Sequence, residues 1–289
     1  MPNVRVIRRR IRSVQNTSKI TKAMEMIAGS KMRRAQQRVL AGRPYSQKLQ
    51  QVLGNLAGQA EEMDEVHPLL EKREVAKIRL VLITPDRGLT GGLNANLNRR
   101  AAQFVLEEKT PTDVIAVGKK GRDFMTRHGQ DVRAVFTDLG DRISLADILP
   151  ITRIITEDYI AGLVDQVYLL YADFVSVVVQ RPTLKQLLPI EPTQEGEAEA
   201  GPAAGYIYEP DGRAVLEQLL PRYVDMQVYQ AMLEANASEQ SARMVAMRNA
   251  TDNAKEMVDS LTLELNKARQ AAITGELLDI TGGVAALEG

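Results

Sequence analysis

Apolar and small residues at the start of the chain recur in alternating steps of four and three. The first members of this stripe are Ile7, Ile11, Val14, Ser18 and Thr21. The segment is also rich in Ala, Met, Gln, Lys and Arg, which are good helix formers. We therefore expect one helix over about residues 3–57, with a narrow seam that faces a single other helix.

The stripe on this first helix is expected to drift after Thr21. The pattern moves it to Ile20, Met24 and Ile27, and then to Ala28, Met32, Ala35 and Val39. Pro44 lacks the amide hydrogen that a helix interior uses, so we expect a kink or local unwinding there.

Helical spacing returns near the C-terminus, from Asp211 onward. The stripe consists of Leu233, Ala237, Gln240, Met244, Met247, Thr251, Ala254, Val258, Leu261, Leu265, Ala268 and Ala272, and Ile273, Leu277, Ile280 and Val284 extend it. At 1.5 Å per residue such a helix spans roughly 100 Å, with a second expected kink at Pro221. Because the chain reverses between the two seamed helices, we expect a long antiparallel coiled coil of the N- and C-terminal helices.

Five short β-rich runs occupy the middle of the chain, at 77–85, 113–118, 131–136, 167–174 and 176–189. Helical stretches at 93–108, 119–128 and 146–166 separate the first four runs. This alternation predicts an α/β fold, with a central Rossmann-like α/β domain and a mostly parallel five-stranded sheet. The last two strands are joined too tightly for a crossover helix and should form an antiparallel hairpin.

These patterns divide the chain into three predicted parts. Residues 1–57 form the N-terminal coiled-coil helix, 75–205 the central α/β domain, and 210–287 the C-terminal coiled-coil helix. Within the central domain, residues 191–205 are acidic and rich in Pro, Gly and Ala. That composition is typical of a mobile surface loop without a core of its own.

Composition narrows the classes of function. The 289 residues include no cysteine, which excludes disulfides, thiolate metal sites and thiol redox switches. The two histidines, His67 and His128, argue against a histidine metal site and are expected at a loop or helix end. The sequence has no apolar run of membrane-spanning length, and its start lacks the apolar region of a secretory signal.

Charge is unevenly distributed although the formal net charge is zero. Glu25 is the only acidic residue among the first fifty, which carry many Lys and Arg residues. A solvated charged face, an acidic protein partner or nucleic acid would each explain this asymmetry. No aromatic residue precedes Tyr45 in the basic run, so stacking on nucleic-acid bases is poorly supported.

A glycine-rich turn, DRGLTGGLN, follows the first predicted strand and is the most enzyme-like motif. Gly88, Gly91 and Gly92 do not form the G-x-G-x-x-G fingerprint, and no G-x-x-x-x-G-K-[ST] motif occurs. We therefore favour a tight turn with close backbone packing over a nucleotide site. The carboxylates after the predicted strands, including Asp86 and Asp141, have the positions of ordinary turn residues. The sequence predicts no catalytic residue, no cofactor site and no metal site.

Two long terminal motifs resemble the gamma subunit of F-type ATP synthases. They are SVQNTSKITKAMEMIAGSKMRRAQ near the start and ASEQSARMVAMRNATDNAKEMVDSLTLELNKARQAAITGELLDI near the end, and YIYEPD and DRGLTGGLN match the same family. The resemblance covers essentially the whole chain. It implies a non-catalytic rotor shaft that couples proton-driven rotation of a c-ring to conformational changes in catalytic beta subunits, with one copy in each complex.

The resemblance also implies partner-binding residues. Arg243 and Gln270 correspond to a polar catch on a beta-subunit loop, where Arg243 could bind a carboxylate through two hydrogen bonds. Lys22, Met24 and Lys31 correspond to the contact of the N-terminal helix with beta. Another set corresponds to a foot on the c-ring and consists of Tyr206, Tyr208 and Glu209.

The implied partners are the alpha and beta subunits of the catalytic head, the epsilon subunit and the c-ring, without nucleic acid. The chain lacks the cysteine pair and the inserted segment of chloroplast-type members. Together with the absence of a leader, this favours a bacterial protein, peripheral on the cytoplasmic side of the plasma membrane. Two alternatives stay open: a nucleotide-binding α/β enzyme with helical extensions, and a basic coiled-coil protein that binds nucleic acid.

Overall fold

The computed structural model describes residues 4–60, 67–191 and 211–288, and it separates into two compact units. The helix-pair unit comprises Met1–Ala28 and Met244–Gly289, and the α/β unit comprises Gly29–Arg243. The boundaries between the units fall inside the two terminal helices. The division of the chain into three domains therefore stays a prediction.

Two long helices begin and end the described chain. α1 spans Val4–Ala60, and α5 spans Gly212–Glu288. Both helices continue through their prolines, so the local unwinding expected at Pro44 is absent. Pro44 is exposed, and water can satisfy the carbonyl group that loses its helical partner there.

In the helix-pair unit, the seam of α1 keeps its spacing without drift. Its buried and half-buried members are Ile7, Ile11, Val14, Ser18, Thr21, Glu25 and Ala28. Of the expected shift, Ile20 and Ile27 are wrong, because these side chains are 60% and 56% exposed, whereas Met24 is half-buried. The later members of the predicted stripe are buried as expected: Ala28, Met32, Ala35 and Val39. A paired helix underwinds to 3.5 residues per turn, so the steps of four and three continue and bring Glu25 into the seam.

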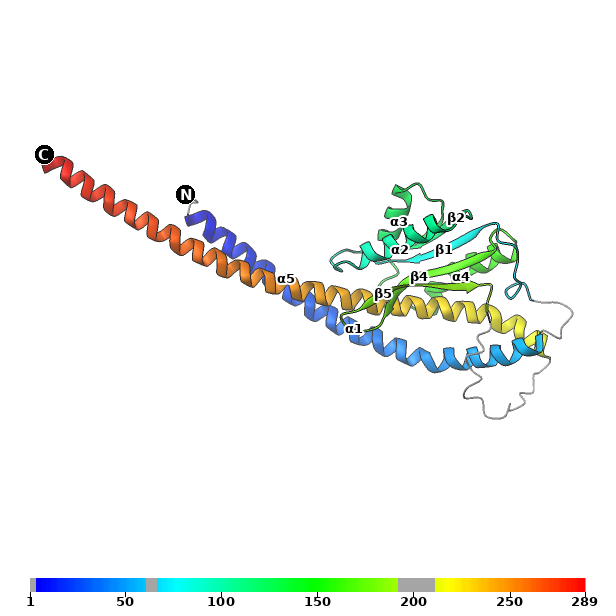
Figure 1. Cartoon of the computed structure of the whole chain (residues 1–289). Helices are drawn as coiled ribbons and strands as arrows, with labels where there is room; N and C mark the ends of the chain where they lie inside the picture. Colours follow the sequence, from blue (N-terminus) through cyan, green and yellow to red (C-terminus); the bar gives the residue numbers. More distant parts are fainter. Residues whose placement is uncertain (1–3, 61–66, 192–210, 289) are drawn as a thin grey trace. The chain divides into compact units, whose positions relative to one another are not determined.

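The two helices of this unit run antiparallel. Thr21 of α1 contacts Thr251 of α5, and Glu25, one turn later, contacts Arg248, one turn earlier. The seam of α5 contains Met244, Met247, Thr251, Ala254, Val258, Leu261, Leu265 and Ala268. Beyond it, Ile273 and Leu277 are at least half exposed, so the expected continuation of a buried stripe is wrong. Within this unit, α5 extends past the N-terminal end of α1 (Figure 1) and has no facing helix there.

The α/β unit contains a five-stranded sheet in the order β3-β2-β1-β4-β5. Its strands are β1 (Ile78–Ile83), β2 (Thr112–Val117), β3 (Val132–Phe136), β4 (Gln166–Phe174) and β5 (Gln180–Leu188). The intervening helices are α2 (Leu93–Glu107), α3 (Lys119–Arg127) and α4 (Leu145–Ile160). Every strand pair is parallel except β4 with β5. The predicted Rossmann-like α/β fold and its terminal antiparallel hairpin are confirmed.

Two hydrophobic cores lie on opposite faces of this sheet. Ile78, Leu80 and Leu82 of β1 pack with α2 and α3, whereas Val81 and Ile83 face the core formed with α1, α4 and α5. Figure 1 shows α2 and α3 on one side of the sheet. Because both faces are covered, β1 is buried along its whole length, which explains why all of its residues except Arg79 are apolar.

Candidate partner-binding surfaces

Lys22 and Met24 lie on α1 in the helix-pair unit, beside the buried Glu25. The Lys22 ammonium lies 3.0 Å from one oxygen of Glu25, and the Arg248 guanidinium lies 3.2 Å from the other. These hydrogen bonds hold the pKa of Glu25 below its ordinary value, and the one from Lys22 has the largest effect. Lys22 stays 54% exposed and Met24 is half-buried, so a partner can still reach this surface.

Lys31 and Arg243, which are far apart in sequence, belong to one hydrogen-bonded network in the α/β unit. The Lys31 ammonium lies 2.6 Å from Oδ2 of Asp141, in the loop between β3 and α4. The amide of Gln240 donates to Oδ1 of Asp141 at 3.3 Å, and Arg243 donates to the Gln240 carbonyl oxygen at 3.3 Å. Asp141 therefore links α1 to α5.

Arg243 also makes an ion pair within α5. Its Nη2 lies 2.7 Å from Oε1 of Glu239, one helical turn away, and its side chain is 14% exposed. Burial raises the pKa of Glu239 despite the opposing effect of Arg243, and the charges of Asp141 and Asp86 add to the rise. A carboxylate from a partner would therefore have to compete with Glu239 and Gln240 for this guanidinium group.

The remaining predicted site residues fall elsewhere. Gln270 is an exposed residue of α5 in the helix-pair unit, whereas Arg243 belongs to the α/β unit. Tyr206, Tyr208 and Glu209, expected to form the foot, lie outside the described residues, as does most of the acidic loop 191–205. His128 ends α3, as expected, and its ring contacts the Phe124 ring at a centroid distance of 4.2 Å.

Open α/β sheets commonly bind ligands in a crevice at the carboxyl ends of the two strands between which the strand order reverses, and in this sheet those strands are β1 and β4. Here α5 fills this crevice. A cavity of only about 60 Å³ remains, and its walls include Met232, Asn236 and Glu239 of α5. Sites for cofactor-sized ligands measure about 300 Å³ or more. Residues of α5 therefore occupy the crevice in which the nucleotide-enzyme alternative would place its ligand.

The glycine-rich turn next to this crevice has a structural explanation. Gly91 adopts a positive φ of 57°, whereas Gly88 has open space around it and a side chain at Gly92 would meet only ordinary contacts. The closest backbone approach occurs instead at Gly118, where a Cβ atom would lie 1.8 Å from the carbonyl oxygen of Thr84. Asp86 accepts hydrogen bonds from the amides of Lys119 and Asp138, so it joins three loops at this edge.

A buried ionic cluster crosses the sheet face that packs against α4. Arg79 of β1 is 1% exposed and donates to both oxygens of Asp113, its neighbour in β2, at 2.7 and 2.8 Å. It also pairs with Asp158 of α4. Lys77 and Arg133 complete the cluster at 3.1 Å from Asp113 and 3.2 Å from Asp158. Because the charges are mutually compensated, the cluster fits a structural role.

Sequence reasoning missed three residues that organise the predicted site: Glu25, Asp141 and Glu239. Glu25 had a signal, because it is the only acidic residue in the basic first fifty and continues the four-three spacing. Asp141 and Glu239 had none, because their contacts depend on how a loop and a helix face meet.

Among the described residues, no group of three or more His, Cys, Asp or Glu side chains has metal-binding geometry. No helix in that part of the chain has the length and apolarity to span a membrane.

Comparison with known proteins gives a consistent result. The family model for ATP synthase matches residues 3–287. The ATP synthase gamma chain of Dehalococcoides mccartyi is 56% identical over 287 residues, covering 99% of this chain and all of that protein. The gamma chain of Roseiflexus sp. (strain RS-1) is 54% identical over 291 residues, covering 99% of each chain.

Solved structures support the same fold. A chain in the Tetrahymena thermophila mitochondrial ATP synthase central stalk and c-ring has a TM-score of 0.62 and 27% identity, covering 80% of this chain and 99% of that one. A chain in the Euglena gracilis mitochondrial ATP synthase has a TM-score of 0.67 with 22% identity, covering 98% and 94% of the two chains, and this shows likeness of fold.

An antiparallel helix pair combined with a Rossmann-like α/β unit defines the class of ATP synthase central-stalk subunits. The chain belongs to the gamma family of ATP synthase. Its role is that of the central-stalk rotor in this membrane-associated complex.

Proposed function

We propose that this chain is a non-catalytic shaft, which transmits proton-driven rotation of a c-ring to the catalytic beta subunits of an alpha–beta head. The reverse direction would couple ATP hydrolysis to proton pumping. In this mechanism the shaft changes the relative stability of beta conformations, since a partner shifts an equilibrium only through its differential binding free energy. One copy of the chain acts in each complex.

The surface of the helix-pair unit is the observation that supports this proposal. Its seam buries one narrow stripe, yet apolar side chains outside the seam stay exposed: Ile20, Met26, Ile27, Met257 and Leu263. Flexible methionines can repack against changing neighbours with little strain. A surface of scattered exposed apolar groups and charges suits successive shallow contacts better than one interlocked interface.

Charged and amide groups are proposed to provide the discrete contacts. Arg243 and Gln270 would bind a polar loop of beta, and the surface of Lys22, Met24 and Lys31 would contact beta from α1. Arg243 is partly sequestered by Glu239, so its engagement with beta would exchange one carboxylate partner for another. Tyr206, Tyr208 and Glu209 are proposed to contact the c-ring.

The proposed partners are the alpha and beta subunits, the epsilon subunit and the c-ring. The Tetrahymena relative is described as part of the central stalk and c-ring, and the Euglena relative as part of an assembly with F1 and the c-ring. The relatives at 54–56% identity come from bacteria. We accordingly propose that the complex is attached to the plasma membrane, with this subunit on the cytoplasmic side.

Co-purification of the tagged chain with its complex tests the proposal. We expect stoichiometric recovery of an ATP-hydrolysing alpha–beta head, with one copy of this chain per complex. Membrane vesicles that contain the complex should make ATP under a proton gradient, and complexes assembled without the chain should not. Recovery of the chain without the head, or full proton-driven synthesis in its absence, would contradict the rotor role.

A further inference from the structure

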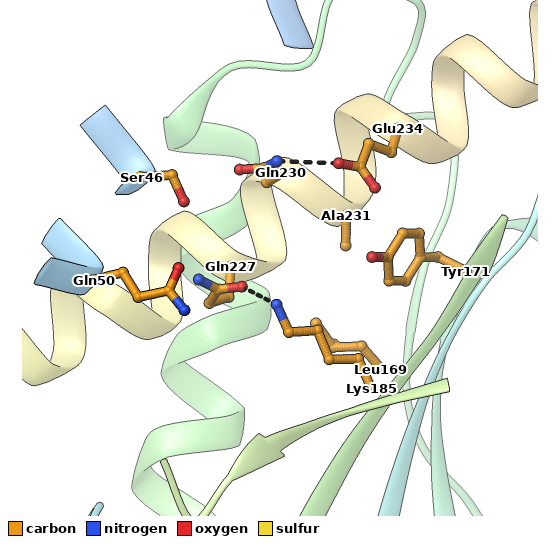
Figure 2. A pocket seen from close by; sticks show the side chains of 9 residues that line it. All are labelled: Ser46, Gln50, Leu169, Tyr171, Lys185, Gln227, Gln230, Ala231 and Glu234. Atoms are coloured by element: carbon orange, nitrogen blue, oxygen red, sulfur yellow. Dashed lines mark hydrogen bonds between the residues drawn. The ribbon is translucent and has the colours of Figure 1, made fainter. Parts of the chain in front are cut away.

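A polar cavity of about 270 Å³ lies in the α/β unit, and the described residues that line it include none of the predicted partner-binding residues (Figure 2). Its walls come from α1 through Ser46 and Gln50, from the sheet through Tyr171 and Lys185, and from α5. At roughly 30 Å³ per water molecule, this volume corresponds to about nine waters. A ligand of about nine non-hydrogen atoms would therefore fill it.

The cavity presents a cation and a carboxylate at different places on its wall. The Lys185 ammonium donates to the carbonyl oxygen of Gln227 at 2.7 Å, and the amide of Gln230 donates to one oxygen of Glu234 at 3.0 Å (Figure 2). The ammonium has three hydrogens, so one hydrogen bond leaves donor capacity. The Glu234 carboxylate, with two oxygens, likewise has acceptor capacity beyond its hydrogen bonds from Gln230 and Tyr171.

Both charges are only partly compensated by the protein. Burial lowers the pKa of Lys185, with the charge of Glu234 opposing this effect. Burial and the charge of Asp173 raise the pKa of Glu234, although hydrogen bonds from Gln230 and Tyr171 and the charge of Lys185 act against this rise. Each group would gain from an opposite charge brought in by a ligand.

We propose that this cavity binds a small zwitterion of the amino-acid class, with its carboxylate on Lys185 and its ammonium on Glu234. A simple anion would meet Glu234, and a simple cation would meet Lys185, so one molecule with both charges fits better than either. Part of the Lys185 side chain reaches solvent although its ammonium group is desolvated, and this leaves the cavity accessible to small solutes. Leu169 and Ala231 supply apolar wall for the methylene groups between the charged ends.

The bound zwitterion would brace α1 and α5 against the sheet, because its contacts come from all three. Binding to the folded chain alone raises thermal stability as ligand concentration increases. This inference does not depend on the proposed rotor function, and the full chain can be tested in isolation from the other subunits.

The probe is 6-aminohexanoate, which has nine non-hydrogen atoms by its formula, compared with hexanoate and hexylamine. Isothermal titration of the full chain should show saturable binding of 6-aminohexanoate, with at least tenfold weaker binding of the two singly charged compounds. The Ala231 methyl resonance should shift with the same saturation curve. The melting temperature of the chain should rise with the concentration of 6-aminohexanoate.

Substitutions locate the site. Lys185→Met and Glu234→Gln each preserve side-chain size and should weaken binding at least tenfold. Lys120→Met and Glu256→Gln, at exposed positions outside the cavity, should leave binding unchanged. Circular dichroism checks that each variant folds. If one of the two cavity variants does not fold, binding to the other cavity variant tests the proposal. The proposal is overturned if no saturable binding occurs, if all three probes bind alike, or if the folded cavity variants bind as the parent chain does.

Discussion

The hydroxyl oxygens of Thr21 and Thr251 lie 2.7 Å apart in the buried seam of the helix-pair unit. Each hydroxyl also reaches a carbonyl oxygen of its own helix, Thr21 that of Ser18 at 3.1 Å and Thr251 that of Met247 at 2.8 Å, so either hydroxyl can donate to the other. Seams built from small residues and methionines allow helices to slide past each other, because many registers pack about equally well. A buried hydrogen bond favours the one register in which its two members meet.

A double-mutant cycle on this pair should reveal their coupling. Thr21→Val leaves the Thr251 hydroxyl without its partner on α1 and should lower the free energy of unfolding by about 1 kcal/mol. Adding Thr251→Val should cost less than the sum of the single changes, because both polar partners are then replaced by apolar groups of similar shape. Chemical denaturation of the four chains measures this. Strict additivity would show that the hydroxyl groups do not interact.

The Arg79 cluster should dominate the stability of the α/β unit. Arg79→Met leaves Asp113 and Asp158 buried without their main partner, which should cost about 3–5 kcal/mol. The matched control is Arg181→Met, at an exposed position of β5, which should change stability by less than about 0.5 kcal/mol. Denaturant unfolding measures this free energy. A small change on Arg79→Met would show that other groups compensate the charges of Asp113 and Asp158.

The same cluster predicts a dependence of stability on pH. Burial alone would raise the pKa of Asp113, but hydrogen bonds from Arg79 and Lys77 outweigh it, and the net pKa is lowered. A carboxyl whose folded pKa is depressed stabilises the fold above its unfolded pKa of about 3.9, and this contribution is lost as pH falls through the folded value. The melting temperature should therefore fall below about pH 5, with a shallower slope in Asp113→Asn. Equal slopes would exclude Asp113 as a source of the acid sensitivity.

Periodicity was sufficient to predict the long helices, and alternation of strands with helices predicted the sheet, because both follow from local spacing. The error at Ile20 and Ile27 shows where local spacing fails. Those residues are more apolar than Glu25, yet Glu25 occupies the seam, since Lys22 and Arg248 compensate its charge. Hydrophobicity alone could not anticipate a partner supplied by a helix at the other end of the chain.

The candidate site was predictable only in part, for a related physical reason. Lys31 and Arg243 were identified from motif resemblance, but the link between them runs through Asp141 and Gln240. Asp141 follows a strand and has the sequence context of an ordinary turn residue. Its contact with two helices depends on tertiary packing, which no spacing rule describes.

Gly118 should be the least replaceable glycine at the carboxyl edge of the sheet. It has a φ of 101°, and an added Cβ would overlap the backbone of Thr84, which cannot rotate away. Gly118→Ala should therefore lower the free energy of unfolding by more than about 3 kcal/mol. Gly88→Ala is the control, because a Cβ added there would have no other atom within 4 Å. Comparable unfolding curves for the two variants would contradict this explanation.

The pair formed by Arg243 and Glu239 allows the partner contact to be separated from the intrachain contact. Arg243→Ala removes both, whereas Glu239→Gln removes the ion pair but leaves the guanidinium group available to a partner. If Arg243 binds a carboxylate of beta, Arg243→Ala should reduce proton-driven ATP synthesis at least tenfold. A hydrogen bond to a charged group contributes about 1.5–3 kcal/mol, and a loss of about 1.4 kcal/mol corresponds to a factor of ten. Glu239→Gln should then retain most of the activity. ATP synthesis is measured in membrane vesicles that carry equal amounts of assembled complex. If Arg243→Ala and Glu239→Gln reduce it equally, Arg243 instead acts inside this chain, where it binds Gln240 and through it the Asp141 loop.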